Sequence, residues 1–151
     1  MRPHVMYTLL LSITLSVSCV TSLWASPRAN ALLDTIDVFL TVDNMKTVGL
    51  TAEHAERVLI DIKQRRYRRV RALGALSILN PTRAQTLLPE LLVKDTDSEV
   101  RAQAAIHLVR VFYTHSPARV LNALNRARAE RSSDVQLLQL IESELKRVES
   151  P

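Results

Sequence analysis

Residues 87–108 read LLPELLVKDTDSEVRAQAAIHL, which is the pattern of two helices joined by a short turn. Thr96 and Glu99 have the spacing of a capping box, in which each side chain satisfies a free backbone N–H of the first helical turn. The second helix is therefore expected to begin near Asp97. Beyond that point the small and aliphatic residues fall on one helical stripe, and alanines there let a neighbouring helix approach closely. The stripe consists of Val100, Ala104, Ala105 and Leu108.

The second helix of this stretch recurs elsewhere in the chain. Residues 70–78 (VRALGALSI) align with residues 100–108 (VRAQAAIHL), so that Val70 takes the place of Val100. A weaker copy begins at Val135, where Gln136 replaces the arginine and larger residues replace the small pair. Self-similarity of this kind indicates stacked helical repeats, and loss of the pattern at the end is typical of a terminal capping repeat.

Further helices are predicted before each copy. Cap and first-turn residues precede them at Thr51, Asn80-Pro81 and Ser116-Pro117. Their expected stripes are Ala55, Val58, Leu59 and Ile62; Leu87, Leu88, Leu91 and Leu92; and Val120, Leu121, Leu124 and Ala127. A last helix over about 133–148 carries Val135, Leu138, Ile141, Leu145 and Val148, and a helix over about 28–42 carries Leu32, Leu33, Ile36, Phe39 and Leu40. With only two glycines and 4% aromatic residues, the composition favours an all-α fold over a sheet.

Residues 87–108 resemble a HEAT or HEAT-like repeat in the Leu-Leu-Pro of the first helix, the D-x-D-x-x-V-R turn and the Ala-Ala pair. The resemblance is strong there, partial over 51–79 and weak over 117–148. It implies a right-handed α-solenoid of about three antiparallel helix pairs with an N-terminal capping helix, spanning residues 26–151 and used mostly for protein–protein contact. It also implies an inter-repeat hydrogen-bond ladder, for which Asp95, Arg71 and Arg101 match the family positions. Arg65 stands where the first unit would carry the aspartate, so the ladder is expected to be incomplete.

The N-terminal segment has the layout of an export signal. Arg2 precedes a run without charge over residues 5–26, and small residues close it at 22, 25 and 26. We therefore expect residues 1–25 to be cleaved and the remainder to be periplasmic or secreted. Two alternatives stay open: a membrane anchor through residues 5–25, and lipidation at Cys19 as in a bacterial lipoprotein.

The chain has a formal charge of +5 and a single cysteine. The charge bears on which partners it can bind, and the cysteine count bears on whether a disulfide can stabilise it. Without Cys19 the processed domain would have no internal disulfide and would depend on burial alone. Removing residues 1–25 takes away only Arg2 among the charged side chains, so the domain stays basic. The expected partner is another protein, through an acidic surface, or an anionic envelope component. No cofactor is expected.

The run RRYRRVR at residues 65–71 is the candidate binding site. On a helical wheel with Val70 facing inward, Arg68, Arg69 and Arg71 point outward or flank the buried side. The helix is expected to begin near Arg66, where its dipole disfavours cations. This arrangement predicts a partner- or anion-binding surface. Its members would be Arg65, Arg66, Arg68, Arg69, Arg71 and Arg101. The alternative is a solvated turn with screened charges, partly paired with Asp61 or Glu56.

Other functions have weaker support. Nucleic acid binding would use the same arginines, but Tyr67 is the one aromatic beside them for stacking, and an export signal argues against it. The histidines lack zinc-type spacing, since His107 and His115 are eight apart and His54 lies in another unit. No Gly-rich phosphate loop or Ser-His-Asp pattern indicates catalysis. We therefore predict a non-enzymatic scaffold. An enzyme-associated factor similar to the HEAT-like lyases that attach bilins is the competing hypothesis, against which the missing cysteine and few aromatics argue.

Overall fold

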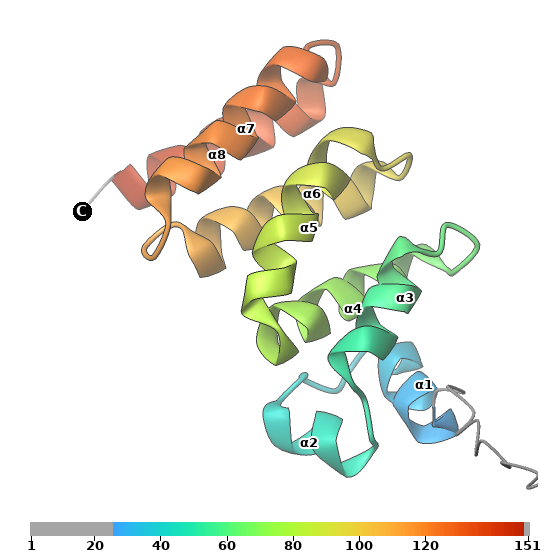
Figure 1. The fold of residues 1–151 in the computed structure, drawn as a ribbon. Helices are drawn as coiled ribbons and strands as arrows, with labels where there is room; N and C mark the ends of the chain where they lie inside the picture. Colours follow the sequence, from blue (N-terminus) through green and yellow to red (C-terminus); the bar gives the residue numbers. More distant parts are fainter. Residues whose placement is uncertain (1–25, 150–151) are drawn as a thin grey trace, which may run out of the picture.

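The computed structural model describes residues 26–149, and they are helical without strands (Figure 1). The predicted export segment, residues 1–25, lies outside the described residues. The elements are α1 (Pro27–Asp34), α2 (Val42–Thr47), α3 (Ala52–Ile60), α4 (Arg66–Leu79), α5 (Pro81–Lys94), α6 (Ser98–His107), a π-helical turn η1 (Leu108–Phe112), α7 (Pro117–Glu130) and α8 (Val135–Glu149). The all-α class predicted from the sequence is confirmed.

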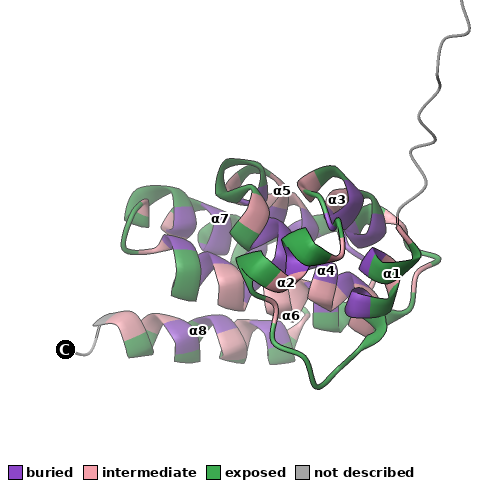
Figure 2. Cartoon of the chain, turned by 90° about the horizontal axis from the view of Figure 1, so that it is seen from below, coloured by how far each residue is buried: buried purple, intermediate pink, exposed green. Residues whose placement is uncertain are grey.

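The helices from α3 onward lie in two rows (Figure 2). We call α3, α5 and α7 the first-helix row and α4, α6 and α8 the second-helix row. Across the rows α3 packs on α4 and α5 packs on α6, while α4, α6 and α8 pack in series along their own row. One hydrophobic core lies between the rows, and its largest fully buried side chains include Leu59, Leu73, Leu88, Leu124 and Ile141.

Local cap chemistry explains where several helices begin. Thr51 accepts a hydrogen bond from the backbone N–H of His54 at the start of α3, and Asn80 accepts one from Arg83 at the start of α5, where Pro81 occupies the first position. The predicted Thr96–Glu99 capping box is wrong. Asp97 caps α6 instead, because its carboxylate accepts the backbone N–H groups of Glu99 and Val100.

The helix predicted over residues 28–42 is present only as far as Asp34, so its predicted extent is wrong. Residues 35–41 run as a loop and separate α1 from α2. α2 has its own start, since Thr41 and Asn44 form a capping box. Ile36 and Phe39, predicted to lie on the buried stripe, are instead 72% and 89% exposed.

Two other stripes need correction at their ends. Ile62 follows α3, in the turn to α4, and is 71% exposed. In α8 the buried face runs through Leu137 and Ile141, so Val135, predicted to be inward, is 60% exposed. The reason is that α8 packs on α6 and η1, which selects a face rotated from the one that the weak repeat alignment suggested.

Candidate functional site

The arginine run lies at the start of α4, as expected. Arg65 is the N-cap residue, and its side chain makes no capping hydrogen bond, so the first N–H groups of α4 have no side-chain acceptor. Of the six predicted binding arginines, Arg65 is the one whose side chain has no hydrogen-bond or ion-pair partner among residues 26–149. It remains exposed to solvent.

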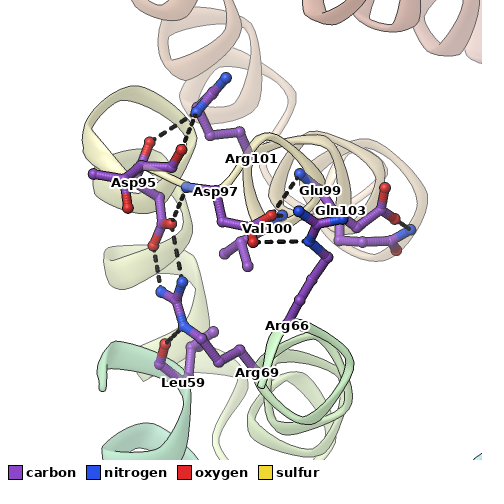
Figure 3. A network of polar contacts seen from close by, with 10 residues as sticks. Leu59, Arg66, Arg69, Asp95, Asp97, Glu99, Val100, Arg101 and Gln103 are labelled. Carbon is purple, nitrogen blue, oxygen red and sulfur yellow. Dashed lines mark hydrogen bonds and ion pairs between the residues drawn. The ribbon is translucent and has the colours of Figure 1, made fainter. Parts of the chain in front are cut away.

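Arg69 does not point outward, contrary to the sequence prediction. Its side chain is 3% exposed and forms a bidentate ion pair with the carboxylate of Asp95, which is equally buried (Figure 3). The Arg69 Nη1 to Asp95 Oδ1 distance is 3.1 Å, and Arg69 Nε donates to the Leu59 carbonyl at 2.8 Å. All three guanidinium nitrogens of Arg69 therefore donate to groups within the protein. Val70, the next residue, is only half-buried.

Arg66 and Arg68 also have partners inside the molecule. Arg66 Nε donates to Asp97 Oδ2 at 2.8 Å, which joins the start of α4 to the cap of α6 (Figure 3). The pKa of Asp97 is lowered overall: its partial burial acts to raise it, but the bonds from Arg66 and from the N–H groups of α6 together outweigh that effect. Arg68 bonds Asn30 and Gln64 and lies 3.6 Å from Asp34. The side chain of Arg66 is still 63% exposed, whereas that of Arg68 is 19% exposed.

Arg71 and Arg101 complete the set. Arg71 donates to the carbonyls of Leu32, Ile36 and Val38, and so pins the loop after α1 to α4. Arg101 donates to the backbone carbonyls of Asp95 and Thr96 and forms an ion pair with Asp134 at 2.7 Å. The predicted ladder through Asp95, Arg71 and Arg101 therefore has different members: the Asp95 carboxylate receives Arg69, Arg101 pairs with Asp134, and Arg71 bonds the loop after α1.

Ion pairs between neighbouring helices run in two directions. Four arginines of α4, α6 and η1 pair with later acids, whereas Arg68 of α4 lies close to the earlier acid Asp34. The four forward pairs are Arg66–Asp97, Arg69–Asp95, Arg101–Asp134 and Arg110–Glu144. In the first-helix row, earlier acids accept later arginines: Glu56–Arg83 and Glu90–Arg126. The hydrogen bonds from arginine lower the pKa of Glu56, Asp134 and Glu144. Glu56 pairs with Arg83, and Asp61 accepts hydrogen bonds from the backbone N–H of Lys63 and the side chain of Gln64, so neither forms the ion pair with the arginine run that the solvated-turn alternative expected. The bond from Gln64 is the main cause of the lowered pKa of Asp61, and the charge of Arg69 is a smaller one.

An apolar surface that the sequence did not predict lies beside Arg71. The loop after α1 exposes Ile36, Val38 and Phe39, and a groove of about 530 Å³ separates it from α4. The groove is lined by Ile36, Asp37, Val38, Phe39, Leu40, Val70, Arg71 and Gly74. In Figure 2 this loop projects on the side of the second-helix row. The cluster of apolar residues at 36–42 is the sequence signal for this surface, but the helical spacing of those residues predicts the buried side of a helix instead.

Two histidines lie inside the helical stack, where His54 is buried and His107 is half-buried. Burial lowers the pKa of both His54 and His107, with nearby arginines as the smaller cause, so both are neutral near pH 7. His54 Nε2 and His107 Nδ1 have no hydrogen-bond partner among the residues that the structure describes. Within residues 26–149, no group of three or more His, Cys, Asp and Glu side chains has the geometry to hold a metal ion.

No protein-family model matches the chain, and neither a curated protein nor a solved structure shows significant similarity to it. None of the helices between residues 26 and 149 has the length and hydropathy needed to cross a bilayer.

Proposed function

We propose that this chain is a non-enzymatic binding protein, a right-handed α-solenoid of the HEAT-like type that holds part of another protein against its second-helix row. The recurrence of the 70–78 pattern at residues 100–108 supports the solenoid, as does the packing of α4, α6 and α8 in series. Stacked helical repeats present an extended surface made of successive equivalent helices, which suits contact with a protein segment.

The observation that carries the binding proposal is the apolar loop at residues 36–39. Phe39 is 89% exposed and Ile36 is 72% exposed, next to the groove against α4. Burying a phenylalanine side chain is worth about 1.5–3 kcal/mol, and clusters of exposed large apolar residues mark interaction sites on soluble domains. We assign Phe39 and Ile36 as the apolar anchors of the interface.

We propose that basic side chains add a second contact with the partner. This basic surface has fewer members than the six arginines that the sequence predicted. Arg65 and Lys63 line a second hollow of about 550 Å³ with Tyr67, Arg68 and Asp34. Both side chains are exposed, and neither forms a hydrogen bond or an ion pair within the described part of the chain. We assign these two side chains the contact with an acidic group of the partner, and we assign the other arginines of the run to the stability of the stack.

A photocrosslinking residue at position 39 tests the interface, with position 62 as the matched control. Ile62 is also apolar and 71% exposed, but it lies in the turn between α3 and α4. The partner captured at position 39 is then purified, and its Kd is measured for the wild type, Phe39→Asp and Ile62→Asp. We expect at least a tenfold weaker Kd for Phe39→Asp alone. Equal binding by the two variants would contradict the proposal.

The site of action is proposed from residues 1–25. We infer export followed by cleavage after this segment, which would leave the helical domain periplasmic or secreted, with an uncleaved anchor or lipidated Cys19 as the alternatives. The intact mass of the protein purified from envelope fractions distinguishes the three outcomes, because cleavage, retention and acylation each give a different mass.

A further inference from the structure

The segment between α1 and α2 has the composition of a helix but the structure of a loop. No proline or glycine interrupts residues 28–48, and apolar residues recur there at helical spacing. Nevertheless no backbone N–H of residues 36–40 donates a hydrogen bond of normal length and angle to the described residues. Something other than local sequence therefore keeps this segment from joining the helices on either side.

Arg71 supplies that restraint. Its guanidinium donates to the carbonyl oxygens of Leu32, Ile36 and Val38, at 3.2, 3.4 and 2.7 Å. In a continuous α-helix these three oxygens would accept the N–H groups of residues 36, 40 and 42. Arg71 thus occupies the acceptors that helix formation across the loop requires. The loop form has three further supports: the Thr41–Asn44 capping box, the hydrogen bond from the Asn44 side-chain amide to the Phe39 carbonyl, and the fully buried side chain of Met45 on α2.

We propose that residues 35–41 are a conformational switch with Arg71 as its latch. While Arg71 bonds the three carbonyls, the segment is a loop that displays Ile36 and Phe39 to solvent. When the latch opens, α1 and α2 join into one helix over residues 27–47, and these two side chains move onto the stripe of Leu32 and Leu33. The proposal goes beyond the proposed binding function, since it concerns a change within the chain that alters which apolar side chains are displayed.

Hydrogen exchange and ¹³Cα chemical shifts of the full chain test the switch. In Arg71→Met, we expect the amides of residues 36–40 to exchange at least tenfold more slowly than in the wild type, with ¹³Cα shifts moving toward helical values. Arg119→Met is the matched control, because Arg119 is an exposed arginine on α7 without a hydrogen-bond or ion-pair partner among the described residues. Adding Val38→Pro to Arg71→Met should abolish the protection, since proline is not tolerated inside a helix.

A second variant keeps the test decisive if Arg71→Met unfolds. Thr41→Ala leaves Arg71 in place but removes the α2 cap and raises the helix propensity of the segment. It should shift the same amides in the same direction by a smaller factor. If α4 to α8 stay protected while the amides of residues 36–40 exchange at the wild-type rate in whichever variant folds, the switch is refuted.

Discussion

Removing Arg69 should destabilise the protein more than removing any other arginine of the run. Arg69 and Asp95 are each 3% exposed, and the pair joins α4 to the turn between α5 and α6. In Arg69→Met the Asp95 carboxylate stays buried with one remaining donor, the backbone N–H of Asp97 at 2.9 Å. The Leu59 carbonyl also loses its side-chain donor. The substitution therefore leaves a buried charge and a weakened backbone acceptor.

The expected cost follows from these two losses. Breaking a buried ion pair by removing one partner costs about 3–5 kcal/mol, mostly because the other charge is left uncompensated. Domains are stable by only about 5–15 kcal/mol, so this loss is a large fraction of the whole. Replacing both partners, as in Arg69→Met with Asp95→Leu, removes the buried charge altogether. The double variant should therefore be more stable than Arg69→Met alone, by about 2 kcal/mol on the same physical grounds.

Urea unfolding followed by circular dichroism at 222 nm measures these differences. Arg65→Met is the control, because Arg65 is exposed and without a partner in the described chain, and such surface substitutions change stability by less than about 0.5 kcal/mol. The reasoning is refuted if Arg69→Met costs no more than the Arg65 control. It also fails if the double variant is the least stable of the set.

Three further predictions use the same unfolding assay. Arg65→Asp should raise stability by about 1 kcal/mol, because the carboxylate would cap α4 and suit its dipole, and a loss would contradict this. Gly74→Ala should stabilise the protein by about 0.5–1 kcal/mol, because alanine favours the helix and the added Cβ would lie at ordinary contact distances of 3.7 and 3.9 Å from Leu40 and His107. Gly49→Ala should destabilise it by about 1 kcal/mol, because the φ of 72° at this position is unfavourable for a residue with a Cβ. Because burial lowers the pKa of His54 and His107 from 6.5, the unfolded chain binds protons first, so stability should fall as pH drops from about 7 to 5. Replacing both histidines with Gln should flatten that fall, and an unchanged slope would count against it.

Local patterns in the sequence predicted much of the fold. The starts of α3 and α5 follow from Thr51 and Asn80-Pro81, because capping depends on residues three or four apart. The buried stripe of α6 and the start of η1 follows from its apolar spacing, and Val100, Ala104, Ala105 and Leu108 are all buried. Such features are determined within one or two turns and need no knowledge of the rest of the chain.

The misplaced features depend on residues distant in the sequence. The alignment of Val70 with Val100 predicts that Val70 faces inward, but the buried residue is its neighbour Arg69, whose burial is made favourable by Asp95 at the end of α5. Similarly, residues 35–41 are held as a loop by Arg71, which lies on α4, beyond both α2 and α3 in the chain. The candidate site differs from the predicted one for the same reason. Acids and carbonyls distant in the sequence bind most of the arginines, and the apolar loop at residues 36–39 is left exposed.

The direction of the ion pairs restricts how such a chain could be lengthened. Asp95 is compensated by Arg69 of the preceding helix pair, but the residue that aligns with Arg69 in the middle pair is Glu99. A tandem copy of the middle pair would therefore place a glutamate, which is exposed on α6, where the next Asp95 needs a guanidinium. That buried aspartate would lack its ion-pair partner, so simple duplication would destabilise the stack and each pair has a fixed place in the order.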